Sequence, residues 1–587
     1  MNDVKARYAL PRRLARFDRE FYSAKQDFTY LGMGALGGKA QGLAFIRDTL
    51  GTRLNPEEFP GITVQIPRLT VLTTGVFDSF MERNKLHDIA CSEATDEQIA
   101  RAFQSASFPE EFVGDLLALI GSMHTPLAVR SSSLLEDAIY RPFAGVYATK
   151  MIPNNQLDRD SRFHRLIEAI KCVYASTFTK KAKSYLAAAG QKLGSEKMAV
   201  ILQEVVGRRY RDKFYPDISG VARSHNFYPT GNARHEDGVV QLALGLGKTV
   251  VDGGTCWSYS PAYPDAAPPF GSATDMLRQT QTEFWTVNMG RPPAYDPMKE
   301  TEYLKLLNVS DAEEDATLDN LVSTYDAASD RVLPGARGAG AKVLNFAPIL
   351  VYDKVPLNHL LASLLKVCEE AVGSHVEIEF AATLDPQRGV PVKFGFLQVR
   401  PTVVTAEEVE VSPESMTGRN VLAASESVMG NGTVEIICDI VYVKPEAFQA
   451  KHTRLIAEQL TAFNAELVEQ QRPYLLIGFG RWGSSDPWLG IPISWSHVSG
   501  AKALVEATLP HMNVELSQGS HFFHNLSSFR VGYFAVRHDG KHQIDWPWLD
   551  HQQTITETEF VRHVRLTQPL SVRMDGRTGR GVILHDG

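Results

Sequence analysis

The sequence has few cysteines, no long apolar run and no block of basic residues. Without CxxC spacing, the cysteines exclude a dense disulfide scaffold or a zinc site and favour reduced thiols in a cytoplasm. No run could span a bilayer, and the charged first residues, Met1 to Glu20, lack the apolar segment of a secretory signal. A net charge of -8 disfavours nucleic-acid binding. We therefore expect a cytoplasmic protein that binds neither membranes nor nucleic acid. The five cysteines are Cys91, Cys172, Cys256, Cys368 and Cys438.

The rest of the composition is ordinary for a globular protein, with 44% hydrophobic and 22% charged residues. At about one domain per 150 residues, the length suggests three or four domains. Helical and extended patterns alternate without an internal repeat, which predicts an α/β to α+β fold. A domain boundary is expected after Val403, where the chain turns acidic and polar. Helices are predicted at 163–187, 318–328, 357–372 and 453–469, strands at 198–206 and 239–244, and irregular structure at 261–297.

Two short segments combine a buried-strand pattern with charge on one side. Side chains alternate faces along a strand, so Glu377 and Glu379 project together, and Gln398 and Arg400 do the same. The loop 385–389 has turn composition, and the segments are predicted to pair as a hairpin. Such a face would bind a hard cation through oxygen ligands, and a phosphate through the cation and the Arg. The alternative is one solvated face of an amphipathic hairpin.

Positive charge is predicted at a glycine–lysine turn and at an isolated arginine. Gly37-Gly38-Lys39 precedes a helical pattern, where backbone N–H groups and an ammonium favour phosphate oxygens, although the Walker A spacing is absent. Arg130 follows a short apolar run, and Arg suits bidentate phosphate contacts. Alone, each pattern is more typical of a solvated surface side chain, or for Arg130 of a strand end that reaches solvent or a nearby acid. Arg481, in a Gly/Trp-rich loop, could be an anion site or part of a tight turn.

Taken in order, these segments resemble the ATP-binding domain of the phosphoenolpyruvate synthase and pyruvate phosphate dikinase family over about residues 30–403. The motifs that carry the resemblance are Gly37-Gly38-Lys39-Ala40, Ile66-Pro67, Thr73-Thr74-Gly75-Val76-Phe77, Val129-Arg130-Ser131-Ser132, Glu136-Asp137, Phe143-Ala144-Gly145, Gln203-Glu204-Val205-Val206, Ser219-Gly220-Val221, Gly245-Leu246-Gly247, Val250-Val251, Glu377-Ile378-Glu379-Phe380 and Leu397-Gln398-Val399-Arg400-Pro401.

The resemblance implies an ATP-grasp-like module that uses ATP and Mg²⁺. It implies that Lys39, Arg130 and Arg400 are catalytic groups on the phosphates and that Glu379, Gln398 and Glu377 hold the metal. Cofactor-binding positions implied for the nucleotide are Lys39, Arg130, Gln203, Glu204, Val206, Gly245, Gly247, Lys248, Glu379, Gln398 and Arg400. In this family a histidine on a swivelling domain accepts the phosphate and passes it on.

Three departures limit what is carried over. Lys248 stands where the family commonly has Glu, so a ligand is lost or Lys248 contacts phosphate itself. No motif of the Gly-Gly-x-Thr-Ser-His-Ala type is present, and His521 and His524 are either phosphoacceptors or ordinary histidines beside buried aromatics. The chain after residue 403 is too short for a swivelling domain and a pyruvate-binding barrel, which needs about 250 residues.

The predicted organisation is a lead-in at 1–29, ATP-grasp subdomains at 30–190 and 191–403, and a mixed α+β domain at 404–587. The predicted function is phosphate transfer from Mg-ATP to a histidine or small-molecule acceptor. The alternatives are a regulatory or scaffold module that binds ATP without turnover, and one subunit of a split dikinase whose phosphohistidine domain lies on a partner chain.

Overall fold

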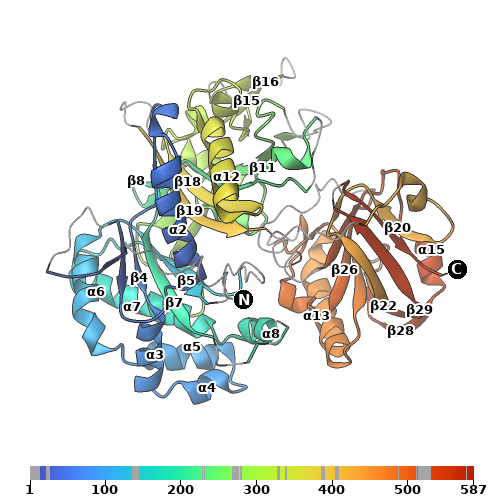
Figure 1. The fold of residues 1–587 in the computed structure, drawn as a ribbon, viewed down its shortest axis with the longest axis horizontal. Coiled ribbons are helices and arrows are strands. Elements are labelled where there is room, and N and C mark those ends of the chain that lie inside the picture. Colours follow the sequence, from blue (N-terminus) through green and yellow to red (C-terminus); the bar gives the residue numbers. More distant parts are fainter. Residues whose placement is uncertain are drawn as a thin grey trace. The chain divides into compact units, whose positions relative to one another are not determined.

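The computed structural model divides the chain into two compact units, which are described separately (Figure 1). Unit 1 comprises residues 1–224, 239–249 and 255–401, and unit 2 comprises 225–238, 250–254 and 402–587. Among the described helices, none combines the length and apolar character needed to cross a membrane. The structure describes residues 14–20, 27–134, 136, 145–188, 191–192, 194, 196–227, 229, 232–266, 276–277, 280–326, 331–336, 340–384, 391–402, 409–484, 486, 488–510, 512, 526, 531–576 and 578–586.

Sheet 1 forms the first half of unit 1. Its central strands are almost entirely buried, as expected of a sheet with both faces covered. β7 runs antiparallel to both of its neighbours. In spatial order the strands are β1 (Ala15–Arg16), β2 (Phe28–Leu31), β4 (Leu69–Leu72), β7 (Met198–Glu204), β5 (Leu127–Ser133) and β6 (Thr149–Ile152).

Helices pack around sheet 1, with α3 against β7 and α7 against β5 and β6. The single helix predicted at 163–187 is two helices, because Thr179 begins a new one by accepting the N–H of Ala182 on its Oγ1 at 3.3 Å. The helices here are α3 (Thr74–Arg83), α4 (His87–Cys91), α5 (Asp96–Ser105), α6 (Glu110–Ser122), α7 (Arg159–Ser176) and α8 (Lys180–Ala188).

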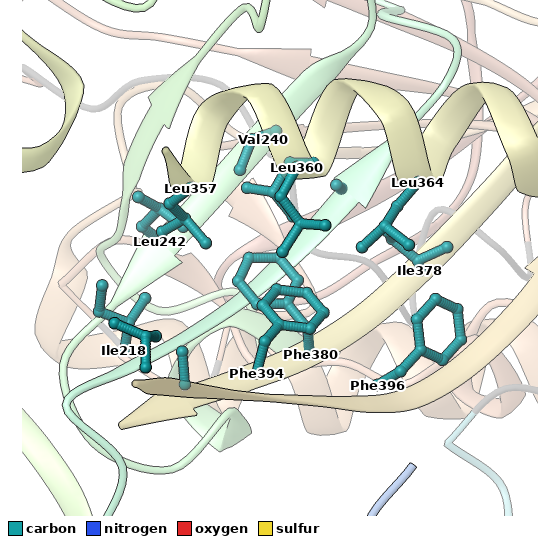
Figure 2. Close-up of a cluster of buried hydrophobic side chains, with 14 of the residues drawn as sticks. Ile218, Val240, Leu242, Leu357, Leu360, Leu364, Ile378, Phe380, Phe394 and Phe396 are labelled. Atoms are coloured by element: carbon teal, nitrogen blue, oxygen red, sulfur yellow. The ribbon is translucent and has the colours of Figure 1, made fainter. Parts of the chain in front are cut away.

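Sheet 2 forms the second half of unit 1 and has two different faces. Its apolar face is covered by α12 (Leu357–Val372), whose leucines point toward Phe380 and Phe394 (Figure 2). The same core includes α2 (Gly38–Arg53), which also contacts β19. In spatial order the strands are β12 (Trp257–Tyr259), β11 (Val239–Ala243), β10 (Ile218–Arg223), β18 (Val376–Thr383), β19 (Val392–Pro401) and β3 (Ile62–Gln65).

Two smaller sheets complete unit 1. The prediction of a helix at 318–328 is wrong, because the centre of this range is strand β15. Its β-branched and aromatic residues favour a strand, and β15 pairs with two other strands. The irregular stretch predicted at 261–297 contains strand β13. The strands of the first sheet are β14 (Leu304–Asn308), β13 (Glu283–Asn288), β9 (Lys213–Tyr215) and β8 (Arg208–Tyr210). Those of the second are β16 (Arg331–Pro334), β15 (Ser323–Asp326) and β17 (Lys342–Val343). Two short helices are α9 (Lys248–Val251) and α11 (Ala347–Leu350).

Unit 2 is built on a mixed sheet in which β22, β23, β26 and β27 are consecutive parallel strands. The helix predicted at 453–469 is confirmed as α13 (Thr453–Glu469). The strands are β20 (Val421–Ser425), β30 (Arg580–Leu584), β29 (Val561–Asp575), β22 (Gly432–Val443), β23 (Tyr474–Phe479), β26 (Ala501–Ala507), β27 (Gly532–Val536) and β21 (Val428–Met429), with β28 (Gln553–Glu557) beside β29; β24 (Arg481–Trp482), β25 (Gly490–Ile491) and α15 (Trp546–Asp550) lie apart from this order.

Unit 2 also includes two segments from earlier in the chain, 225–238 and 250–254. The first joins β10 to β11, and its ends are held by Asn226 and His235, whose backbone groups lie 2.8 Å apart. The second carries Gly253, whose carbonyl oxygen lies 3.5 Å from Nη1 of Arg481. The chain therefore enters unit 2 twice before its last long segment.

Candidate functional site

The polar hairpin predicted from side-chain alternation is present as β18 and β19. Glu377 lies opposite Arg400, and Glu379 lies opposite Gln398. Ile378 and Phe380 project to the other side, into the core under α12. The predicted turn 385–389 lies outside the described residues. The strand alternation therefore places two carboxylates, a carboxamide and a guanidinium on one face of sheet 2.

Arg130 connects sheet 1 with sheet 2. Its Nη1 donates to Oε1 of Gln203 and to the carbonyl oxygen of Leu397, both at 2.9 Å. Its Nη2 donates to Oε1 of Gln398 at 2.6 Å and lies 3.9 Å from a carboxylate oxygen of Glu379. The structure thus places Arg130, the predicted phosphate-binding side chain, beside Glu379 and Gln398, two of the predicted metal ligands.

The two carboxylates of the hairpin have different surroundings. Glu377 is 1% exposed, and Arg400 binds one of its oxygens through Nε at 2.7 Å and also through Nη2. Its other oxygen accepts from Nε of Arg223 at 2.6 Å. Glu379 keeps 15% of its side chain exposed and receives Nη2 of Arg400 at 3.2 Å. Glu379 is therefore the more accessible carboxylate of the two.

Lys39 lies at the start of α2, where two glycines allow close packing. Gly37 has a φ of 77°, and a Cβ there would be 1.7 Å from the carbonyl oxygen of Ser132. The Lys39 ammonium donates to Glu136 at 2.7 Å and to the hydroxyl of Ser131 at 3.3 Å. Lys39 therefore bonds to the residue that follows Arg130 in β5.

Helix α2 also lies directly against the polar hairpin. A Cβ on Gly42 would be 3.4 Å from the carbonyl oxygen of Val399, which is flanked in sequence by Gln398 and Arg400. The glycine–lysine turn and the acidic hairpin therefore belong to one packed region of unit 1.

The implied nucleotide-binding positions Gln203, Glu204 and Val206 lie at the end of β7 and just after it. Gln203 is 1% exposed, and its Nε2 has no hydrogen-bond partner among the residues that the structure describes. The backbone N–H of Glu204 donates to the carbonyl of Arg68 at 2.9 Å. A Cβ on Gly395 of β19 would be 2.5 Å from Val206, so this segment packs against the hairpin at the end away from Arg400.

The segment 245–248 follows β11. Gly245 has a φ of 83°, and a Cβ there would be 2.7 Å from the carbonyl of Trp285. The ammonium of Lys248 lies 6.0 Å from the centre of the Trp285 ring, in the range of a cation–π contact. Gly247 lies beside Ser219, whose side chain is on the polar face of sheet 2.

Four polar residues that contact the predicted site residues directly or, for Gln241, through Arg223 were given no role from the sequence, although Ser131 and Glu136 lie within the quoted motifs: Ser131, Glu136, Arg223 and Gln241. Gln241 is the one polar side chain of β11, and Arg223 is a charged side chain at the end of the mostly apolar β10, a signal that was available. Glu136 bonds to Lys39 across 97 residues, which no local pattern predicts. Together with the predicted residues they give four cations and three carboxylates: Lys39, Arg130, Arg223, Arg400, and Glu136, Glu377, Glu379.

Metal ligands could come from the side chains of the residues that the structure describes. None of their His, Cys, Asp and Glu side chains form a group of three that could hold a metal ion. Glu379 and Gln398 are in register on the hairpin, and each side chain carries an oxygen that could ligate a cation, although Oε1 of Gln398 also accepts the hydrogen bond from Arg130 given above. Two such ligands fit Mg²⁺, because this ion keeps water and phosphate oxygens in its other positions. His521, His524, Asp137, Phe143 and Ala144 lie outside the described residues.

A comparison with protein families completes the description of unit 1. The family model of the pyruvate phosphate dikinase AMP/ATP-binding domain matches residues 33–420. This match covers more than half of the chain and every position from Lys39 to Arg400. The chain belongs to the pyruvate phosphate dikinase AMP/ATP-binding domain family.

Proposed function

We propose that this protein is an ATP-dependent phosphotransferase whose unit 1 is an ATP-grasp-like module. The observation that carries the proposal is the contact of Arg130 with Gln398 and its 3.9 Å approach to Glu379. A phosphate-binding cation and an oxygen-ligand pair thus lie within one hydrogen-bonded group. Phosphoryl transfer needs little else from a protein than alignment of the phosphates and neutralisation of their charge.

The hairpin supplies the direction in which ATP would lie. Adenine would lie at 203–206, where the buried Nε2 of Gln203 is a donor available to a base. The phosphates would extend along β19 past Gln398 toward Arg400, which is five residue steps beyond Gly395. At about 3.3 Å per residue this is the length of an extended triphosphate nucleotide.

Glu379 and Gln398 would hold Mg²⁺, which neutralises phosphate charge when bound. Arg130 and Arg400 would contact phosphate oxygens through their planar forks. For Glu377 we favour a different role from metal ligation, because guanidinium groups already occupy both of its oxygens.

Lys39 would bind phosphate by exchanging partners. In the structure its ammonium is held by Glu136, whose other oxygen accepts the N–H of Ser133 at 3.0 Å. A triphosphate at the start of α2 carries more charge than one carboxylate and would also face the positive end of the helix dipole. We therefore expect the nucleotide to draw Lys39 away from Glu136.

The acceptor remains a histidine, on this chain or on a partner, or a small molecule. The second candidate function is a regulatory module that binds ATP without turnover, and Lys248 at a position that is commonly Glu in the family favours it. A split dikinase would transfer phosphate to a separate phosphohistidine chain.

The deciding experiment is incubation of the purified chain with ATP labelled at the β or γ phosphate, with Mg²⁺. Release of AMP indicates dikinase chemistry, ADP indicates a simple kinase, and no product despite tight binding indicates the regulatory module. Glu379→Gln should abolish turnover. The matched control is Glu97→Gln, in an exposed helical ion pair with Arg101. Equal activity of the Glu379 variant and the wild type would overturn the site assignment.

A further inference from the structure

Three strands of sheet 2 place charged side chains in a row at the far end of the site. Arg223 on β10 is in register with Glu377 on β18, and Glu377 is in register with Arg400 on β19. Glu377 receives one guanidinium on each oxygen, with Nε of Arg223 at 2.6 Å and Nε of Arg400 at 2.7 Å. The row continues to β11, because Nη1 of Arg223 donates to Oε1 of Gln241 at 3.2 Å.

This row is almost completely buried. Glu377 and Arg400 are 1% and 2% exposed, and the side chain of Arg223 is 11% exposed. A buried ion pair adds little net stability over apolar residues of similar size, because the charges lose their hydration. An Arg–Glu–Arg row next to a candidate catalytic group is therefore better explained by orientation than by stability.

The orientation at stake is that of Arg400. Its Nη2 is shared between Glu377 and Glu379, at 3.2 Å from the latter. Glu377 holds Arg400 in place only while its own carboxylate is fixed, and Arg223, anchored by Gln241, fixes the opposite oxygen. Arg223 thus determines how far the guanidinium of Arg400 extends toward Glu379.

We propose that Arg223 is a positioning residue which, through Glu377, holds Arg400 for the terminal phosphate. This inference rests on the proposed function and adds to it that Glu377 orients an arginine. A planar fork is required, because an ammonium could not meet Glu377 and Gln241 with the same geometry.

The test compares Arg223→Met and Arg223→Lys with Arg400→Met and the double variant Arg223→Met/Arg400→Met. Loss of positioning should lower kcat about 10- to 100-fold in Arg223→Met, since a displacement of about 1 Å can cost that much. The Kd of a non-hydrolysable ATP analogue should change less than about threefold, and Arg223→Lys should recover part of kcat. In the Arg400→Met background, Arg223→Met should have no further effect on kcat.

The control for a merely structural role is Lys150→Met. Lys150 forms a buried pair with Glu302 at 2.5 Å and projects from sheet 1 to the face opposite Arg130. Lys150→Met should lower the unfolding temperature. When activity is measured well below the unfolding midpoint of this variant, kcat and the effect of Arg400→Met on kcat should be unchanged. If Arg223→Met does not fold, Arg223→Lys carries the same comparison.

The outcomes separate the two proposals. A wild-type chain that converts no ATP overturns the proposed function. If the wild type turns over ATP, two results overturn the positioning role alone. In the first, Arg223→Met has the same kcat as the wild type. In the second, the effects of Arg223→Met and Arg400→Met on kcat multiply independently in the double variant.

Discussion

Nη2 of Arg130 lies 2.6 Å from Oε1 of Gln398, although the two residues are 268 positions apart in the sequence. The bond joins β5 of sheet 1 to β19 of sheet 2. It brings residues from the two sequence segments that were predicted independently to bind phosphate and metal. Any ligand that reaches Glu379 therefore also meets Arg130.

Arg130→Lys should weaken binding of Mg-ATP about 10- to 100-fold. The ammonium keeps the charge but cannot bond to Gln203, Leu397 and Gln398 at once, and each charge-assisted bond is worth about 1.5–3 kcal/mol. Titration calorimetry measures the loss. Arg101→Lys, at an exposed position on α5, is the control and should bind like the wild type. Unchanged affinity in the Arg130 variant would remove this residue from the site.

Gly37→Ala should destabilise unit 1 by about 1–3 kcal/mol and impair nucleotide binding. The residue has a φ of 77° and its Cβ would meet the Ser132 carbonyl at 1.7 Å, so the start of α2 and Lys39 must shift. Gly51→Ala is a control in the same helix, where nothing lies within 4 Å of the added Cβ. It should stabilise by about 0.5–1 kcal/mol, since Ala favours helices. Denaturant unfolding compares the two; equal effects would contradict the packing described here.

Unit 2 should lose stability in acid through Asp439. Burial alone would raise the pKa of Asp439, but hydrogen bonds from His563, Arg472 and Arg565 outweigh it and lower the pKa to about 2. A lowered carboxyl pKa gives stability that is fully present above the unfolded value of about 3.9 and is lost as the pH falls toward 2. We expect a loss of about 2 kcal/mol across this window.

The measurement is the unfolding free energy of wild type and Asp439→Asn between pH 5 and pH 2. The variant should be less stable at pH 5 and should show a shallower decline in acid. Asp539→Asn is the control: the hydrogen bond from Arg537 also lowers the pKa of Asp539, but this ion pair is exposed and should contribute little to stability. Parallel pH profiles for wild type and Asp439→Asn would rule out the linkage.

The local sequence pattern was sufficient to predict the helices and strands whose apolar residues repeat with one clear period. The hairpin followed from alternation at Glu377 and Glu379, and α12 and α13 have the predicted bounds because their apolar residues repeat at helical spacing. The pattern failed at 318–328, where pairing of β15 with β16 and β17 overrides any helical tendency.

The candidate site was only partly predictable for a related reason. Arg223 and Glu136 are defined by partners 154 and 97 residues away, and a single sequence does not show which distant side chain a polar residue will meet. The resemblance supplied the positions of Lys39, Arg130 and Glu379, but it did not show that Glu377 would be enclosed by two guanidinium groups.

The early segments 225–238 and 250–254 have a consequence for biosynthesis. They leave the ribosome long before the residues after 402 with which they form unit 2. Domains generally fold as units, starting from the N-terminus during translation. Here the two loops that interrupt the nucleotide-binding part of the chain acquire their packing partners only after residues beyond 402 have been synthesised. In a nascent chain that ends before residue 402, these two loops should therefore lack the segment with which they form unit 2.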